Sequence, residues 1–144
     1  MSTPEAAILD HIGIATLNVG ALAARLNAML GLPTVGHGTA PDGGVAVALL
    51  STSSQSSPIV APRLELLAPT STASPVAKFL DRRGPGLHHI GFRVPNLDVA
   101  LARLHARGVP LIDQVPRAGL DGTRIAFLHP AACGGVLVEL VEAN

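Results

Sequence analysis

One strand-like motif that carries a histidine occurs twice in this chain, 78 residues apart. The segment Leu9–Ile14 (LDHIGI) aligns with Leu87–Phe92 (LHHIGF), and Asn18 and Asn96 keep the same offset. An internal repeat of this kind means that one structural unit is used twice. We therefore expect the 144 residues to fold as two half-sized modules of similar structure.

Both halves show the same order of predicted elements. Residues 8–15 are predicted to form a strand, followed by a helix capped at its N-terminus by Asn18. In the second half the strand covers 87–94, and Asn96 caps the helix. Strand-type sequence then follows each helix, at 44–50 and 62–67 in the first half and at 123–128 and 135–141 in the second. Each half is thus predicted to be a β-α-β-β-β module.

The boundaries of the modules follow from this order. We expect one domain over residues 1–144, with module one at about 6–69, a connector at about 70–85 and module two at about 86–144. A short helix is predicted over 75–83 within the connector, with Pro75 in its first turn. The serine-rich segment 51–58 is predicted to be a solvated loop.

The composition narrows the possible partners. The 10 basic and 10 acidic residues cancel, and no basic run or aromatic cluster indicates nucleic acid or an anionic membrane surface. A small-molecule partner is therefore favoured. Cys133 is the single cysteine, the apolar runs are too short to span a bilayer, and no signal-peptide pattern is present. We expect a soluble cytoplasmic protein with a core built from its 48% apolar residues.

Four polar side chains in apolar surroundings indicate a metal site. Strand alternation places His11 and His89 away from the helix-packed face, next to glycines that leave space for a ligand. Glu65 and Glu139 are lone carboxylates within apolar runs, where a charge is costly to bury unless it is paired or metal-bound. Any one of them alone is more typical of a solvated sheet face. Four at equivalent repeat positions favour a divalent cation such as Zn, Co, Ni or Mn.

The remaining histidines and the cysteine are interpreted as structural or incidental. His88 is expected to point toward the helix side, and His129 to hydrogen-bond within a turn before the next residue, a proline. His105 is predicted to lie on a helix and His37 in a Gly-rich turn. Cys133 has no partner cysteine and no Cys-His spacing, so it is predicted to be a small packing residue.

Six segments together form a more specific pattern: LDHIGIA at 9–15, ELLAP at 65–69, SPVAKFL at 74–80, GLHHI at 86–90, FLHP at 127–130 and CGGVLVEL at 133–140. This pattern resembles the methylmalonyl-CoA epimerases, within the vicinal-oxygen-chelate superfamily, over nearly the whole chain. The resemblance implies an α+β fold in which two tandem βαβββ modules form a curved mixed sheet around a central metal cleft, with helices on the outer face. It also implies a homodimer.

The resemblance further implies a reaction, the interconversion of the R and S forms of methylmalonyl-CoA at C2 through a metal-stabilised enolate. The implied metal ligands are His11, Glu65, His89 and Glu139, and the implied metal is Co, Mn, Ni or Zn. Inversion needs a proton returned to the opposite face, so two proton-transferring groups are expected. Glu139 is the first choice for one of them. Glu65 could be the other, because Val47 stands where some family members carry an acidic residue proposed for that role.

Other departures from the family pattern keep alternatives open. Ala24–Leu26 replaces an aromatic pair that is common on the first helix, and Asp121 stands where a histidine is frequent. A glyoxalase-type isomerase on the same scaffold and a metal-free small-molecule-binding protein are the alternatives; two carboxylates fit an extradiol dioxygenase less well. Cationic residues that could meet the phosphates of a CoA substrate are Lys78, Arg82, Arg83, Arg117 and Arg124.

Overall fold

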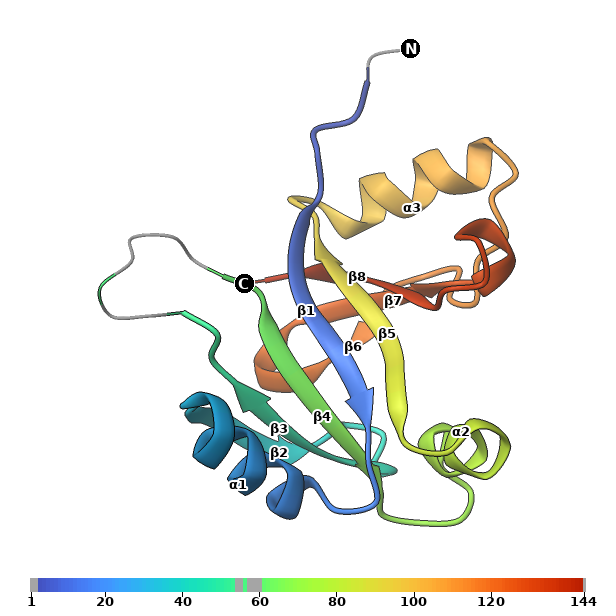
Figure 1. Cartoon of the computed structure of the whole chain (residues 1–144). Coiled ribbons are helices and arrows are strands. Elements are labelled where there is room, and N and C mark those ends of the chain that lie inside the picture. Colours follow the sequence, from blue (N-terminus) through green and yellow to red (C-terminus); the bar gives the residue numbers. More distant parts are fainter. Residues whose placement is uncertain (1–2, 54–55, 57–60, 144) are drawn as a thin grey trace. The chain divides into compact units, whose positions relative to one another are not determined.

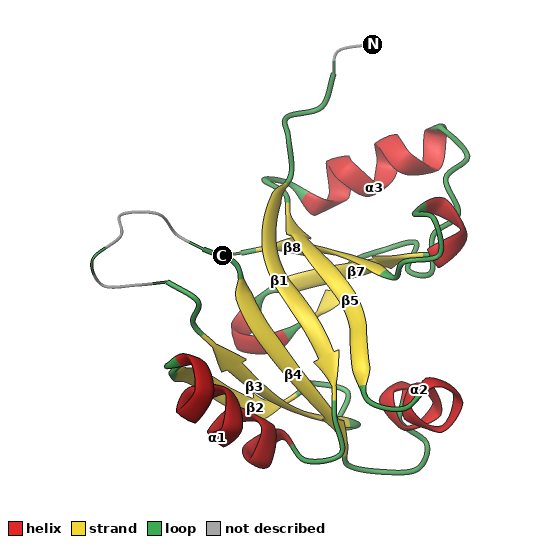
Figure 2. Ribbon diagram, viewed as in Figure 1, coloured by secondary structure: helices red, strands yellow, loops and turns green. Residues whose placement is uncertain are grey.

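The computed structural model describes residues 3–53, 56 and 61–143, and Figures 1 and 2 show their helices and strands. In chain order the elements are β1 (Ile8–Ala15), α1 (Val19–Leu30), β2 (Thr34–Thr39), β3 (Val45–Leu50), β4 (Arg63–Pro69), α2 (Pro75–Arg83), β5 (Gly86–Arg93), α3 (Leu97–Ala106), β6 (Arg117–Ala118), η1 (Leu120–Gly122), β7 (Arg124–Leu128), η2 (Pro130–Ala132) and β8 (Val138–Glu142). The two β-α-β-β-β runs, separated by α2, confirm the predicted α+β fold class.

The chain forms two compact units, His11–His89 and Met1–Asp10 with Ile90–Asn144. The division runs through β1 and through β5, immediately beside the two repeated histidines. The module boundaries expected from the sequence remain a prediction.

In the unit His11–His89 the strands are ordered β2-β3-β4-β1. Strand β1 pairs in parallel with β4, whereas β3 pairs antiparallel with both β2 and β4. Helix α1 begins because the Asn18 side chain accepts a hydrogen bond from Ala21 N at 2.9 Å, and it ends at Gly31, whose φ is +70°. Its apolar side packs on β3 and β4 over the fully buried Leu50 and Leu66.

In the other unit the strands are ordered β5-β8-β7-β6, with β5 parallel to β8. Helix α3 begins in the same way as α1, since Asn96 Oδ1 accepts from Val99 N at 2.9 Å. A cluster of buried apolar residues joins this helix to β7 and β8: Leu97, Leu101, Ala126, Leu128 and Leu140.

The repeat is visible in the register of the two parallel pairs. Gly13 of β1 lies opposite Glu65 of β4, and Gly91 of β5 lies opposite Glu139 of β8. In each unit the glycine two residues after the motif histidine therefore neighbours the candidate carboxylate. Because residues two apart on a strand share a face, each glutamate is placed on the face of its motif strand that carries the histidine.

Two strands were not located from the sequence. Strand β2 is a Gly-containing, largely exposed edge strand, and it holds His37, so the predicted Gly-rich turn at that residue was wrong. Strand β6 is only two residues long.

The serine-rich loop predicted over 51–58 lies partly outside the described residues. Among the described residues, no helix is long and apolar enough to cross a membrane.

Candidate metal centre

Three of the four predicted ligand side chains converge within the unit His11–His89. His11 and His89 are each 3% exposed, and their Nε2 atoms lie 2.9 Å apart. Glu65 contacts both rings: its Oε2 is 3.6 Å from His11 Nε2 and its Oε1 is 3.6 Å from His89 Nε2. Two buried imidazole nitrogens and a half-buried carboxylate thus face one another.

A glycine on β1 makes this approach possible. A Cβ on Gly13 would lie 2.3 Å from both Cε1 and Nδ1 of His89, closer than any real contact of that kind. Only a residue without a side chain therefore leaves room for the His89 ring. The sequence indicated that glycines beside the histidines provide space for a ligand. The structure shows that the space at Gly13 is filled by the ring of His89.

The fourth predicted ligand, Glu139, lies on β8 in the other unit. It is 6% exposed and stands between Gly91 of β5 and Phe127 of β7. A carboxylate in such a position must be compensated by a charge partner or by hydrogen bonds. The structure does not place the two units relative to each other, so the geometry given for the site is that of the other three residues.

The chemistry of these side chains fits a divalent metal ion. His11, Glu65 and His89 offer imidazole nitrogens and a carboxylate, the donor types that transition-metal ions such as Zn, Co, Ni and Mn accept. A cation at this position would also offset the cost of burying the Glu65 carboxylate. The cluster therefore suggests a divalent metal site.

His88 lies closer to this centre than its predicted structural role required. Its ring meets that of Phe79 on α2 edge-on, with centroids 4.8 Å apart, which confirms that it points toward a helix. Its Nδ1 also lies 2.9 Å from Nδ1 of His89. The sequence placed the two side chains on opposite faces of the strand, and only the three-dimensional structure shows that their ring nitrogens meet.

The other candidate residues stand apart from the centre. His129 Nδ1 accepts a hydrogen bond from Ala131 N at 3.0 Å, which confirms its turn-stabilising role, and His105 is exposed on α3. Cys133 packs against the apolar cluster beneath α3, as predicted, and burial raises the pKa of its thiol.

Two of the five cations proposed for CoA phosphates are engaged in ion pairs. Arg124 bridges Asp98 at 2.9 Å and Glu142 at 3.3 Å, and the hydrogen bond with Asp98 raises the pKa of Arg124 above its usual value. Arg117 lies 3.2 Å from Asp113. The other three, Lys78, Arg82 and Arg83, are exposed on α2.

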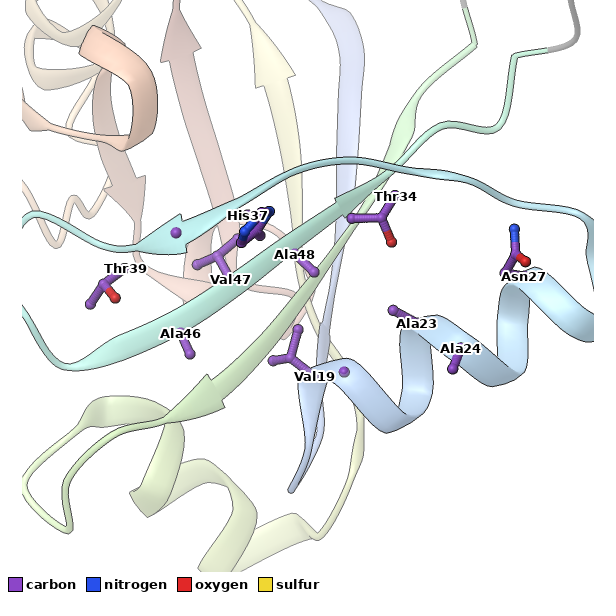
Figure 3. Close-up of a pocket in the computed structure, with 12 residues that line it drawn as sticks. Val19, Ala23, Ala24, Asn27, Thr34, His37, Thr39, Ala46, Val47 and Ala48 are labelled. Atoms are coloured by element: carbon purple, nitrogen blue, oxygen red, sulfur yellow. The ribbon is translucent and has the colours of Figure 1, made fainter.

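A separate cavity lies on the helix side of the unit His11–His89 (Figure 3). It has a volume of about 720 Å³ and is lined by small residues of α1, β2 and β3, with Asn27 and His37 among them. Ala24 lines it at one of the positions where the sequence lacks an aromatic pair. None of the four candidate ligands contributes to this cavity.

Comparisons with known proteins show the family to which this chain is similar. Residues 10–127 match the model of the Glyoxalase/Bleomycin resistance protein/Dioxygenase superfamily. The uncharacterized protein YqjC of Bacillus subtilis is 40% identical over 134 residues, which cover 93% of this chain and 91% of that protein. The ethylmalonyl-CoA/methylmalonyl-CoA epimerase of Cereibacter sphaeroides is 33% identical over 136 residues, covering 93% and 96%.

A solved structure extends this similarity to the fold. A variant of the Streptomyces coelicolor methylmalonyl-CoA epimerase, in complex with 2-nitronate-propionyl-CoA, superposes with a TM-score of 0.87 at 37% identity, covering 96% of each chain. The structural similarity thus includes a protein solved in complex with 2-nitronate-propionyl-CoA.

Proposed function

We propose that this chain, which belongs to the Glyoxalase/Bleomycin resistance protein/Dioxygenase superfamily, is a metal-dependent methylmalonyl-CoA epimerase. The observation that carries the proposal is the convergence of His11, Glu65 and His89 in a chain that is similar over its full length to epimerases of malonyl-CoA derivatives. The reaction would interconvert the R and S forms at C2.

We assign His11, Glu65, His89 and Glu139 as the ligands of a divalent ion, with Co, Mn, Ni and Zn as the candidates. The register supports the inclusion of Glu139, because it lies opposite Gly91, two residues from His89 on the same strand. When bound, the ion would supply positive charge that stabilises the negative charge developing on the substrate oxygens.

The chain's own carboxylates would move the proton. Glu139 would accept the C2 proton on one face of the substrate, and Glu65 would return a proton to the opposite face, so that the configuration inverts and the proton count is unchanged. The unit around Glu65 supports this assignment, because β2 and β3 contain no acidic residue and Glu65 is the single one in β4.

The partner classes follow from the same proposal. The substrate would be an acyl-CoA, and the exposed cations of α2, Lys78, Arg82 and Arg83, are candidates for contacts with its phosphates. We further propose a cytoplasmic homodimer that binds neither nucleic acid nor membranes.

Proton exchange in heavy water tests the proposal. The protein, supplied separately with Co, Mn, Ni and Zn, is incubated with R- or S-methylmalonyl-CoA in D2O, and deuterium at C2 and inversion are measured. We expect both, and we expect both to disappear when the metal is removed with a chelator.

Variants then separate the two carboxylates. Glu139→Gln and Glu65→Gln should each stop inversion and should each retain exchange for one epimer only, opposite in the two cases; the exposed Glu5→Gln is the matched control. Metal content is measured in each variant so that loss of the ion is distinguished from loss of a base. Metal binding without exchange would favour a glyoxalase-type isomerase, and absence of metal binding would favour a metal-free binding protein.

A further inference from the structure

The two ring nitrogens of His89 have different neighbours. Its Nε2 faces His11 Nε2 at 2.9 Å and Glu65 Oε1 at 3.6 Å. Its Nδ1 lies 2.9 Å from Nδ1 of His88. One nitrogen therefore points to the ligand cluster and the other to a second histidine.

A contact between two ring nitrogens restricts where the protons can be. In neutral imidazoles one nitrogen donates and the other accepts, so a nitrogen-to-nitrogen hydrogen bond needs one proton on one side of the contact. If His89 donates from Nδ1, its Nε2 keeps a lone pair directed toward the cluster. A metal ligand needs such a lone pair, and ligating histidines in general donate their other N–H to a neighbouring acceptor.

We infer that His88 is a positioning residue that accepts this hydrogen bond and holds His89 in the Nδ1–H tautomer. In the metal-free protein the 2.9 Å contact between the two Nε2 atoms is then donated by His11, whose Nε2 would release that proton when a metal binds. The inference rests on the proposed metal site and deepens it by adding a residue that orients one ligand.

The surroundings of His88 hold its own ring in place. Phe79 of α2 packs edge-on against it, with an interplanar angle of 70°, and the Arg83 guanidinium lies 5.9 Å from the centroid of the Phe79 ring. Helix α2 thus helps to hold the His88 ring, which in turn contacts the proposed metal ligand His89. This gives the connector helix a role in the site, although it carries no ligand.

His88 has no histidine equivalent in the first copy of the repeated motif. The equivalent residue of the first motif is Asp10, which lies 3.7 Å from Arg93 in an ion pair. The repeated motifs therefore differ at the residue that precedes the ligand histidine.

The tautomer is read directly by NMR. In the protein labelled with ¹⁵N-histidine and prepared without metal, long-range ¹H–¹⁵N correlations identify the protonated nitrogen of His89. We expect the Nδ1–H form in the wild type and in His88→Asn, whose side-chain oxygen lies near the position of the imidazole Nδ1 and can accept. In His88→Leu, which has no acceptor, the Nε2–H form should appear.

Metal affinity provides the second measurement. Competition with a chromophoric chelator should show a loss of roughly 10- to 100-fold for Zn or Co in His88→Leu, with most of it recovered in His88→Asn. The matched control is His105→Leu, an exposed helical histidine that should leave both readings unchanged. Circular dichroism melting confirms that each variant is folded.

The outcomes are distinct. An unchanged tautomer and unchanged affinity in folded His88→Leu would overturn the inference. If the wild type bound no divalent metal, the proposed function would fail, while the tautomer measurement would still decide whether His88 orients His89.

Discussion

Replacing Gly13 with alanine tests the packing on which the centre depends. The new Cβ would lie 2.3 Å from His89 Cε1 and 2.9 Å from its Nε2, whereas ordinary contacts begin at 3.4 Å. The His89 ring would have to retreat by about 1 Å, several times the tolerance of about 0.2 Å on metal–ligand distances. Because the ring is only 3% exposed, we expect Gly13→Ala to cost about 1–3 kcal/mol of unfolding free energy and to weaken metal binding strongly.

A matched glycine provides the control. Gly36 also lies on a strand of the same unit, but a Cβ there would meet Leu49 Cδ1 at 3.5 Å, an ordinary contact. Urea denaturation of the metal-free proteins and chelator competition with Zn give the two quantities for each variant. Gly36→Ala should keep the metal affinity of the wild type.

A double-mutant cycle isolates the cause. If the steric conflict with His89 is responsible, Gly13→Ala should lose most of its cost to stability in a His89→Ala background, because no ring remains to be displaced. An equal cost in both backgrounds would refute the packing argument. So would a Gly13→Ala protein with unchanged stability and metal affinity.

Three further predictions concern stability and reactivity. Gly20 is the second residue of α1, and the nearest atom to a new Cβ there is Asn18 Oδ1 at 3.6 Å. Gly20→Ala should therefore raise the unfolding free energy in urea, by less than the roughly 0.5–1 kcal/mol typical of a helix interior. Gly31→Ala, at φ +70°, should lower the unfolding free energy, and the same sign for both would contradict this reasoning. Leu97→Ala removes a side chain that is 0% exposed and should cost about 2–5 kcal/mol, measured in the same way; a loss below about 1 kcal/mol would show that the cluster adapts. Since burial raises the pKa of Cys133, the folded protein holds less thiolate near pH 8 than the unfolded chain. Iodoacetamide should therefore react more slowly with it than in urea, with the difference shrinking as the pH rises through the folded pKa, and equal rates at pH 8 would contradict the shift.

Local sequence signals account for most of the fold. The caps at Asn18 and Asn96 form the predicted hydrogen bonds, because capping depends on residues within one turn of helix. The strand Ile8–Ala15 and the helix Pro75–Arg83 have the predicted bounds. Alternation along β1 and β4 also placed His11 and Glu65 away from the core face, and the two side chains lie 3.6 Å apart.

Features that depend on tertiary packing were not predictable. Strand β2 lacks a periodic apolar pattern because it is an exposed edge strand whose contacts are made mainly by its backbone to β3. The place of the His89 ring over Gly13, and its hydrogen bond with His88, depend on how neighbouring strands and α2 pack. The sequence contains no local signal for such contacts.

The arrangement of β3 and β4 also explains why Glu65 would need two roles in the proposed reaction. Leu49 of β3 lies opposite Glu65, and Val47 lies two residues further along the same face, so that face presents buried apolar side chains where a second acid would be needed. On the proposed function, Glu65 must then both hold the metal and transfer a proton. Glutamine keeps an oxygen donor but has no basic oxygen, so Glu65→Gln should weaken metal binding less than it weakens proton exchange. A parallel loss of both would mean that the residue acts only as a ligand, and the second base would have to lie outside this sheet.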